Sequence, residues 1–459
     1  MPVADPRWSD GLLEAGFGAP DLAASVGWSA RVTRMVEVEA ALGRALGRAG
    51  VVPDAVAAAI ADACRADRVD VDDLARSAPS APTPVIPLVG ALVARCDDPE
   101  AAAWLHHGAT SQDIVDTAAI LQVRDALVHL DTGLAALAET CAGLAATHRA
   151  TVMAGRTLGQ QAVPVTFGLQ AARWLGMVDR RRRMLAALRP SLLVVQFGGA
   201  AGTLGVYGDL GPDVLAALAD ELGLAVPELP WHAERDRIVD LAGWLAGVAA
   251  MVEKVATDLL LHAQTEVAEL RQAPGAGPGS SAMPHKANAT HAVAARAAAR
   301  LARGECHVLV DAAGGNEFER AAGAWQAEWV ALPSALVRTA GALARLRAAL
   351  DGLEVDADRM RHNLAVGLGL TSTEALAGAL TPALGRPAAQ ALVGDVAARA
   401  LAESRALAEV AAEDARVTDV LDPATLAATL DPASVVATAG PMVDRALAVH
   451  ERTVRELAP

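Results

Sequence analysis

A polar segment from Gly279 to Asn288 reads Gly-Ser-Ser-Ala-Met-Pro-His-Lys-Ala-Asn and combines two hydroxyls, an ammonium group and an amide. It does not fit a P-loop, because Lys286 lies seven residues beyond Gly279 and is followed by Ala287 instead of Ser or Thr. These groups suit a loop that binds an anion. Ser280 is also a possible base, because a neighbouring positive charge makes a deprotonated hydroxyl easier to form. A plain linker between two helices is the alternative.

A second polar cluster, His106 to Asp113, reads His-His-Gly-Ala-Thr-Ser-Gln-Asp and precedes a helical pattern. One interpretation is that Ser111 or Asp113 caps that helix. The other is that Thr110, Ser111 and the N-terminal amides of the helix hold a carboxylate. We expect no metal site, because adjacent histidines point in different directions and the sequence has no H-E-x-x-H motif.

Three further polar breaks separate helical stretches. They are Arg156 to Gln161, Glu234 to Arg237, and Glu317 to Arg320, which leads into Trp325-Gln-Ala-Glu-Trp329. For the run at 234–237, a solvated face with local ion pairs is as good an interpretation as a binding site.

Long helices would position these segments. Helical patterns cover about 114–148, 166–189, 236–272, 289 onward and 325–350, with Pro190 predicted to end the second and Pro82, Pro84 and Pro87 predicted to mark a loop. The stretch 241–252 is apolar on nearly all sides, so it must be covered by other helices. A bundle completed by other subunits is the prediction, and a bundle within one monomer is the alternative.

The amino-acid composition argues against several classes of function. Lys and Arg number 39 and Asp and Glu 54, which gives a formal charge of −15 and argues against a nucleic-acid or anionic-membrane partner. Ala and Leu supply most of the 53% hydrophobic content and aromatic residues are 3%, which favours helices over strands. The apolar run 241–252 is shorter than the ~18 residues of a membrane span. No secretory signal or disulfide framework is visible, which predicts a cytoplasmic protein.

Together the five segments resemble the fumarase/aspartase superfamily. The segment 279–288 looks like its signature, G-S-S-x-M-P-x-K-x-N, and His106-x-Gly-Ala-Thr-Ser-x-Asp113 looks like another shared segment. Arg156-Thr157 and the Gly-Gly-Ala-Ala-Gly-Thr run that ends at Thr203 also match. The resemblance covers nearly the whole chain.

The resemblance implies an all-α subunit with a central bundle of very long helices. Its three domains would span 1–112, 113–360 and 361–459. It implies a homotetramer whose active sites are shared between subunits, a small di- or tricarboxylate substrate, and no metal or organic cofactor. Members of the superfamily carry out addition or elimination beside a carboxylate through a stabilised carbanion.

The resemblance also assigns roles to residues. Ser280 would be the general base, Lys286 and Asn288 would stabilise the charge that forms on the substrate carboxylate, and His106 would be a nearby hydrogen-bond or charge partner. The remaining substrate-binding residues would be Thr110, Ser111, Arg156, Thr157, Gln161, Arg235, Ser281, Met283 and Arg320.

Within the superfamily, the segments at 108–113, 196–203, 231–237, 325–329 and 384–386 are most similar to the bacterial 3-carboxy-cis,cis-muconate cycloisomerases, enzymes of protocatechuate breakdown. Fumarase and adenylosuccinate lyase have a histidine where this chain has Leu158, and that histidine is linked to protonation of a poor leaving group. A carboxylate leaving group needs no such proton, so Leu158 fits the cycloisomerase. Ala287, Ala289 and Phe318 depart from the cycloisomerase pattern. Ala287 stands in place of an arginine and Phe318 in place of a histidine, and these two changes reduce the positive charge expected at the site.

Two alternatives remain open. One is a lyase of the same superfamily that eliminates an amine or a stable anion, such as nitrite, from a substituted succinate to give fumarate. The other is a non-catalytic scaffold that kept the fold, against which the presence of Ser280, Lys286 and Asn288 counts.

Overall fold

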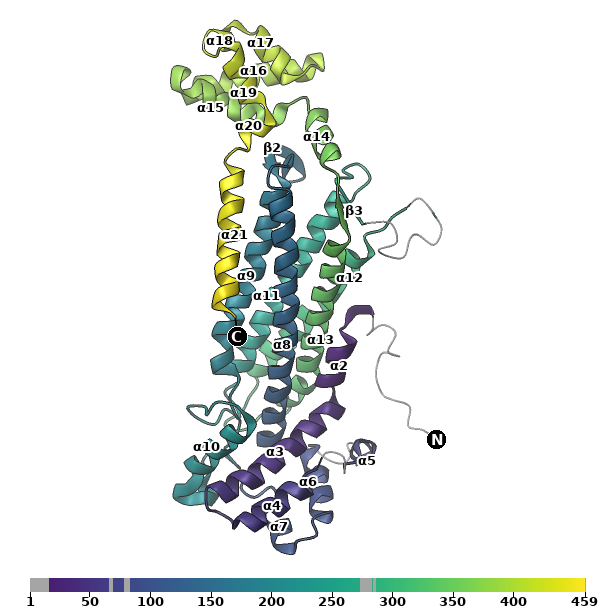
Figure 1. Ribbon diagram of the computed structural model, residues 1–459, viewed down its shortest axis with the longest axis vertical. Helices are drawn as coiled ribbons and strands as arrows, with labels where there is room; N and C mark the ends of the chain where they lie inside the picture. The colour runs from purple at the N-terminus through teal and green to yellow at the C-terminus, as the bar shows by residue number, and fades with distance from the viewer. Residues whose placement is uncertain (1–15, 66–68, 78–82, 273–282, 284–285, 459) are drawn as a thin grey trace. The chain divides into compact units, whose positions relative to one another are not determined.

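The computed structural model describes residues 16–65, 69–77, 83–272, 283 and 286–458. Ser280 and Ser281 lie outside the described residues. The described chain is mostly helical, as predicted from its Ala- and Leu-rich composition, and Figure 1 traces its elements. It divides into two compact units, each assembled from three stretches of chain. Unit 1 comprises 1–134, 181–253 and 294–344, and unit 2 comprises 135–180, 254–293 and 345–459. The three-domain division uses other boundaries and stays a prediction.

Five long helices contribute residues to both units. They are α8 (Ser111–Thr147), α9 (Phe167–Leu192), α11 (Asp236–His262), α12 (Thr290–Ala313) and α13 (Ala324–Asp351). Their small, unbranched side chains favour helix and allow close packing. In unit 1, the α8 residues from Gln112 to Val123 are all buried, which explains the absence of an amphipathic pattern in that part of the sequence.

Shorter helices complete unit 1. They are α2 (Pro20–Val26), α3 (Trp28–Arg48), α4 (Asp54–Ala63), α5 (Val71–Ser77), α6 (Val85–Ala94), α7 (Pro99–Trp104), the 3-10 helix η3 (Gly205–Leu210) and α10 (Gly211–Leu222). Helix α3 packs against α4 and α10 (Figure 1). The approach of α3 to α4 requires a glycine at position 43, because a Cβ there would lie 2.4 Å from a side-chain carbon of Ile60.

Unit 2 contains two small antiparallel sheets of two strands each and a helical C-terminal part. The strand β1 (Val152–Thr157) pairs with β2 (Gln160–Thr166), and β3 (Leu270–Gln272) pairs with β4 (Leu353–Val355). The helices are α14 (Ala357–Val366), η4 (Leu370–Ser372), α15 (Thr373–Leu384), α16 (Arg386–Glu403), α17 (Leu407–Glu413), α18 (Ala415–Thr418), α19 (Pro423–Leu430), α20 (Pro432–Val435) and α21 (Ala439–Glu456). A core centred on Leu376, Leu392 and Val410 joins α15, α16 and α17.

The C-terminal helix α21 is attached to the rest of unit 2 by a buried histidine. The Nδ1 atom of His450 lies 3.0 Å from Asp179 of α9, and its Nε2 atom lies 3.2 Å from Glu139 of α8. His450 and Asp179 are both buried. This contact fixes α21 alongside α8 and α9 within unit 2.

Three element boundaries differ from the prediction. Pro87 lies in the first turn of α6, where the helix has no use for its N–H group. Pro190 lies inside α9, which continues to Leu192, because a proline near the end removes only one late hydrogen bond. The helix predicted over 236–272 ends at His262, where the chain turns back so that Glu269 N–H donates to the carbonyl of His262.

Among the described residues, no single helix has the length and hydropathy needed to cross a membrane. Two pairs of shorter helices meet that threshold only when taken together, and each pair is sharply bent at its break.

Candidate functional site

In unit 1, Asp113 links two of the segments singled out in the sequence. Its buried carboxylate accepts hydrogen bonds from the backbone N–H groups of Thr110, Gly198 and Gly199, at 2.9 to 3.0 Å. Gln196 also donates to it, and His232 Nε2 lies 2.7 Å from it. Asp113 therefore caps α8 as predicted, and it also joins the segment 106–113 to the glycine-rich segment 196–203.

Two glycines make this junction possible. Gly108 and Gly199 have φ angles of 75° and 72°, a region that favours glycine. A Cβ on Gly108 would collide with the Tyr207 ring, and one on Gly199 would lie 2.8 Å from the carbonyl oxygen of Gly108. The Tyr207 hydroxyl donates to the carbonyl of His107, which holds the loop in place.

Arg320 is part of the same cluster. Its guanidinium donates to the backbone carbonyl of Ala200 at 2.7 Å and to the side chain of Gln112 at 3.3 Å. The structure thus brings four residues predicted to lie at a site into one region of unit 1, namely His106, Thr110, Ser111 and Arg320. The three at 106, 110 and 111 are partly exposed, so a small molecule can reach them.

His106 has a partner that the sequence did not predict. Its Nδ1 atom lies 2.6 Å from a carboxylate oxygen of Glu39 on α3. Burial opposes a charge on the ring, but the hydrogen bond and charge of Glu39, with the charge of Asp113, outweigh it and raise the pKa of His106.

Arg235 lies in a buried network of ion pairs. Its side chain is buried, and its five N–H groups donate to Asp116, Glu328 and the carbonyl of Trp231. Burial lowers the pKa of Arg235, but the two carboxylates outweigh this effect and raise it above the ordinary value. Because every donor is used, this geometry favours a role for Arg235 in holding α8, α11 and α13 together, and direct contact with substrate stays a prediction.

In unit 2, Arg156 extends from β1 and forms a two-pronged ion pair with Glu269, with contacts of 2.6 and 3.0 Å. The Glu269 side chain is fully buried and also bonds to His262 and Asn363. Burial raises the pKa of Glu269, but the hydrogen bonds from His262, Arg156 and Asn363 outweigh it and hold the value at about 2. Glu269 therefore stays ionised and fixes Arg156.

The β1–β2 hairpin presents the other two predicted residues of unit 2. Thr157 is exposed at the end of β1, and Gln161 near the start of β2 donates to the carbonyl of Asn363. The turn between the strands is Leu158-Gly159, with φ angles of 52° and 79°. Leu158, at the position of the superfamily histidine, is fully exposed and contributes no proton donor.

The structure describes only part of the signature segment, residues 279–288. Lys286 and Met283 are exposed, with a backbone hydrogen bond from Lys286 N–H to the carbonyl of Met283, and Asn288 is half-buried just before α12. Phe318, one of the positions that departs from the pattern, has a φ angle of 47° and a side chain that is 92% exposed. Phe318 thus resembles Leu158 in combining a left-handed backbone with an exposed apolar side chain.

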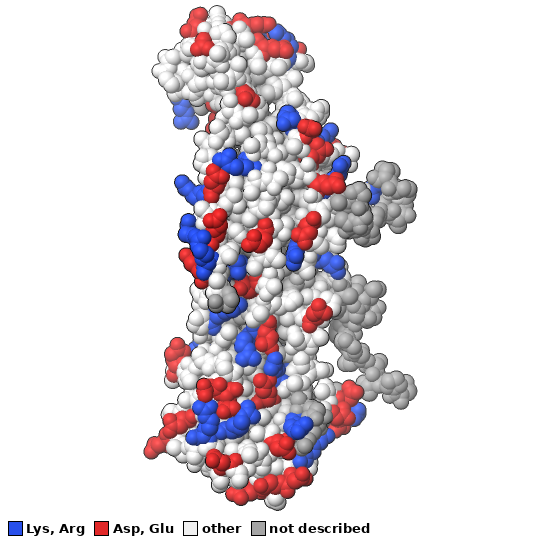
Figure 2. Space-filling view, viewed as in Figure 1, with Lys and Arg blue, Asp and Glu red and all other residues white. Residues whose placement is uncertain are grey.

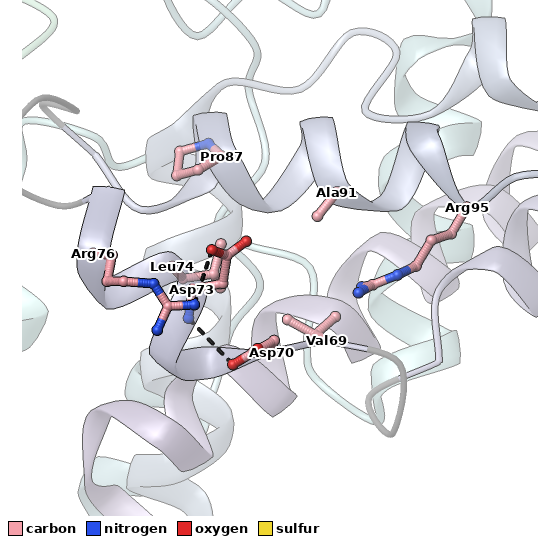
Figure 3. Close-up of a pocket in the computed structure, with 8 residues that line it drawn as sticks. All are labelled: Val69, Asp70, Asp73, Leu74, Arg76, Pro87, Ala91 and Arg95. Atoms are coloured by element: carbon pink, nitrogen blue, oxygen red, sulfur yellow. Dashed lines mark hydrogen bonds and ion pairs between the residues drawn. The ribbon is translucent and has the colours of Figure 1, made fainter. Parts of the chain in front are cut away.

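One cavity among the described residues contains none of the predicted site residues. It has a volume of about 320 Å³, lies in unit 1 between α5 and α6, and is lined by Asp70, Asp73, Arg76 and Arg95 with Val69, Leu74, Pro87 and Ala91 (Figure 3). Asp73 there pairs with Arg76. In the described part of the chain, no group of three or more His, Cys, Asp or Glu side chains is placed to hold a metal ion.

Charges of both signs are mixed on the surface shown in Figure 2, where acidic and basic side chains lie beside one another. Many of them pair, as Arg48 does with Asp220 and Arg149 with Asp444. On the described residues of this face, no basic patch of the kind that binds nucleic acid is visible.

Sequence reasoning missed Glu39, Glu269 and His232. A signal was available for Glu39, because it occupies the apolar stripe of α3 formed by Met35, Leu42 and Leu46. A carboxylate on a core stripe must have a buried partner. No comparable signal marks Glu269 or His232, whose partners are distant in the sequence.

Comparison with known proteins agrees with this arrangement. Residues 19–304 match the family model described as lyase, and residues 369–446 match the model described as adenylosuccinate lyase C-terminus. The chain is 46% identical over 385 residues to 3-carboxy-cis,cis-muconate cycloisomerase of Pseudomonas aeruginosa, which covers 83% of this chain and 84% of that protein. It is 44% identical over 394 residues to nitrosuccinate lyase of Streptomyces davaonensis, which covers 83% of each.

A solved structure is also similar. The crystal structure of 3-carboxy-cis,cis-muconate lactonizing enzyme from Pseudomonas putida matches with a TM-score of 0.90 and 40% identity, over 97% of this chain and 100% of that one. The all-α, fumarase-like fold expected from the sequence is therefore confirmed. The chain belongs to the lyase family of the fumarase/aspartase superfamily.

Proposed function

We propose that this protein is a cycloisomerase that interconverts 3-carboxy-cis,cis-muconate and 4-carboxymuconolactone. The observation that carries the proposal is the 46% identity, over 83% of the chain, to a relative named for that reaction. Leu158 supports it, because a site without a proton donor at this turn suits a leaving group that departs as a carboxylate.

The proposed chemistry follows from the charges that the reaction creates. In the ring-opening direction, the base removes a proton from the carbon alpha to a carboxylate, and the negative charge moves onto that carboxylate. The ring C–O bond then breaks and its oxygen leaves as a carboxylate. In the lactonising direction, that carboxylate oxygen adds to the double bond and the base returns its proton to the alpha carbon.

We assign the base to Ser280, with Lys286 and Asn288 stabilising the doubly charged carboxylate. In the Asp113 cluster, the groups that would bind the substrate are Thr110, Ser111 and Arg320. In the other segments, the substrate-binding residues would be Arg156, Thr157, Gln161, Ser281 and Met283. Preorganised donors of this kind stabilise developing charge, which is commonly the largest single contribution to catalysis.

The first test is an ultraviolet assay that follows loss of the conjugated diene of 3-carboxy-cis,cis-muconate. We expect fast loss with the native chain, and a loss of activity of at least ~100-fold in Ser280→Ala. Ser191→Ala, which changes an exposed serine on α9, is the matched control and should behave as the native chain. Near-normal activity in Ser280→Ala would refute the assignment of the base.

A second candidate function is elimination of nitrite from nitrosuccinate to give fumarate. It is favoured by the 44% identity to a nitrosuccinate lyase, and nitrite, like a carboxylate, leaves without a proton. Fumarate formation at 240 nm together with nitrite release, without any loss of carboxymuconate, would establish this activity and exclude the cycloisomerase.

We further propose that the protein works as a homotetramer in the cytoplasm, with active sites shared between subunits. In unit 1, α12 exposes Leu301, Val308 and Val310, and α13 exposes Val330. Apolar side chains on the long helices of a single chain are typical of a surface covered by other copies. The four cysteines are free thiols, as is usual in a reducing compartment.

A further inference from the structure

A buried carboxylate on α3 contacts the loop that leads into the Asp113 cluster. The Glu39 side chain has no exposed surface, and its Oε1 atom lies 2.6 Å from Nδ1 of His106. Its other oxygen, Oε2, is also buried and has no hydrogen-bond partner among the described residues. An ionised carboxylate in such a place is costly unless a positive charge lies beside it.

His106 is the group that can supply that charge. The titratable groups around the pair are Glu39 on α3, Asp113 on α8, Tyr207 on η3 and Cys64 after α4, with His107 next in the chain. Burial raises the pKa values of the Tyr207 hydroxyl and the Cys64 thiol, so both are neutral near pH 7. Two carboxylates therefore act on the His106 ring.

The backbone holds the His106 ring in an unusual position. The φ angle of His106 is 60°, a left-handed conformation that is unfavourable for a residue with a side chain. Strain of this kind persists only where the surroundings enforce it, and it is concentrated at functional sites. Here the Glu39 contact on one side and the Gly108 turn on the other enforce it.

The ring is also accessible. The His106 side chain is 20% exposed, and in the described part of the chain its Nε2 atom has no hydrogen-bond partner. Thr110 and Ser111, the proposed carboxylate-binding residues, follow within the same short segment.

We propose that Glu39 is a positioning residue that keeps His106 in the imidazolium form and directs its Nε2–H toward a carboxylate of the substrate. The inference rests on the proposed function, since it assigns a cationic contact to a substrate with several carboxylates. The His106 imidazolium supplies a charged hydrogen-bond donor from unit 1, and this donor does not belong to the signature segment.

The kinetic test compares Glu39→Gln with the native chain in the carboxymuconate assay across pH. Glu39→Gln keeps the shape of the side chain and removes its charge, so His106 loses its proton at lower pH. We expect the alkaline limb of kcat/KM to move down by about one pH unit, a tenfold loss at pH values above the limb. Glu100→Gln, which removes an exposed carboxylate on α7, is the matched control and should leave the limb in place.

A second measurement does not depend on turnover. Proton titration of ¹³C-labelled histidines by NMR, with the His106 signal identified by its absence in His106→Asn, reports the pKa directly. We expect the His106 pKa to lie above ~6.5 in the native chain and to fall in Glu39→Gln but not in Glu100→Gln.

The outcomes separate the two proposals. A native His106 pKa at or below ~6.5, or one unchanged in Glu39→Gln, overturns the inference. If the His106 pKa falls in Glu39→Gln but the alkaline limb of kcat/KM stays in place, the role of His106 in substrate binding is overturned. Absence of carboxymuconate turnover in the native chain refutes the proposed function, whatever the titration shows.

Discussion

Glu269 shows how a single buried carboxylate can fix an arginine, here the proposed substrate-binding residue Arg156. Its four hydrogen bonds, from Arg156 (two), His262 and Asn363, connect β1 to the end of α11 and to α14. Because these donors lower its pKa from 4.5 to about 2, the ionised form stabilises the fold. That contribution is complete above the unfolded-state pKa and disappears as the pH falls toward 2.

We therefore expect Glu269→Gln to lower the free energy of unfolding at pH 7 by on the order of 3 kcal/mol. The difference from the native chain should shrink as the pH falls below 4.5. Urea unfolding at a series of pH values measures it. A difference that stays constant between pH 7 and pH 3.5 would show that the charge of Glu269 is not what stabilises the hairpin.

Arg235 permits a test between structural support and direct substrate binding. Replacement by Lys leaves three donors where five were used, and both Asp116 and Glu328 stay buried. We expect Arg235→Lys to destabilise the protein by about 3–5 kcal/mol and to lower its thermal midpoint strongly. A variant that melts like the native chain and differs only by a raised KM would support the prediction that Arg235 binds substrate.

The β1–β2 turn places a leucine in a left-handed backbone conformation, which strains the turn. A two-residue turn with positive φ at both positions favours Asn-Gly, and here a leucine occupies the first position. We expect Leu158→Asn to raise the free energy of unfolding by about 1 kcal/mol, measured as a higher thermal midpoint. Because Leu158 is exposed and lacks a proton donor, cycloisomerase activity should be unchanged, and a clear fall in activity would show that its side chain contacts the substrate.

The elements also show what the sequence can predict. The cores of the long helices were predictable from their long stretches of helix-forming residues, and α8 and α13 begin and end within about three residues of the expected positions. The β1–β2 hairpin was not predicted as strands, because a pair of short strands leaves no periodic signal distinct from a loop. The end of α11 was missed because it is set by distant contacts of Glu269, which local propensity does not encode.

In the candidate site, too, local motifs could be recognised from the sequence and distant contacts could not. The candidates His106, Thr110, Ser111 and Arg320 could be named from the sequence because residue type and order mark the motifs that contain them. Their supporting groups could not be found in this way. Glu39 lies 67 positions from His106, and His232 lies 119 positions from Asp113, so only the folded chain shows which carboxylate serves which partner.

For the whole molecule, the proposed tetramer makes activity depend on assembly. Leu301 and Val308 are seven residues apart on α12, so they lie on one face of the helix. We expect the double change Leu301→Glu with Val308→Glu to prevent assembly and to abolish turnover, with both followed by light scattering and the diene assay. Leu401→Glu, at an exposed apolar position on α16, is the control that should assemble and turn over normally. An active monomer would contradict the shared site.

The attachment of α21 through His450 has a consequence for how the chain is made. The buried carboxylate of Asp179 receives its histidine partner from a helix that is synthesised 271 positions later in the chain. During synthesis, this contact can form only after α21 has been made, so this part of unit 2 completes its packing late. A chain that stops before α21 would therefore leave the carboxylate of Asp179 without its histidine partner.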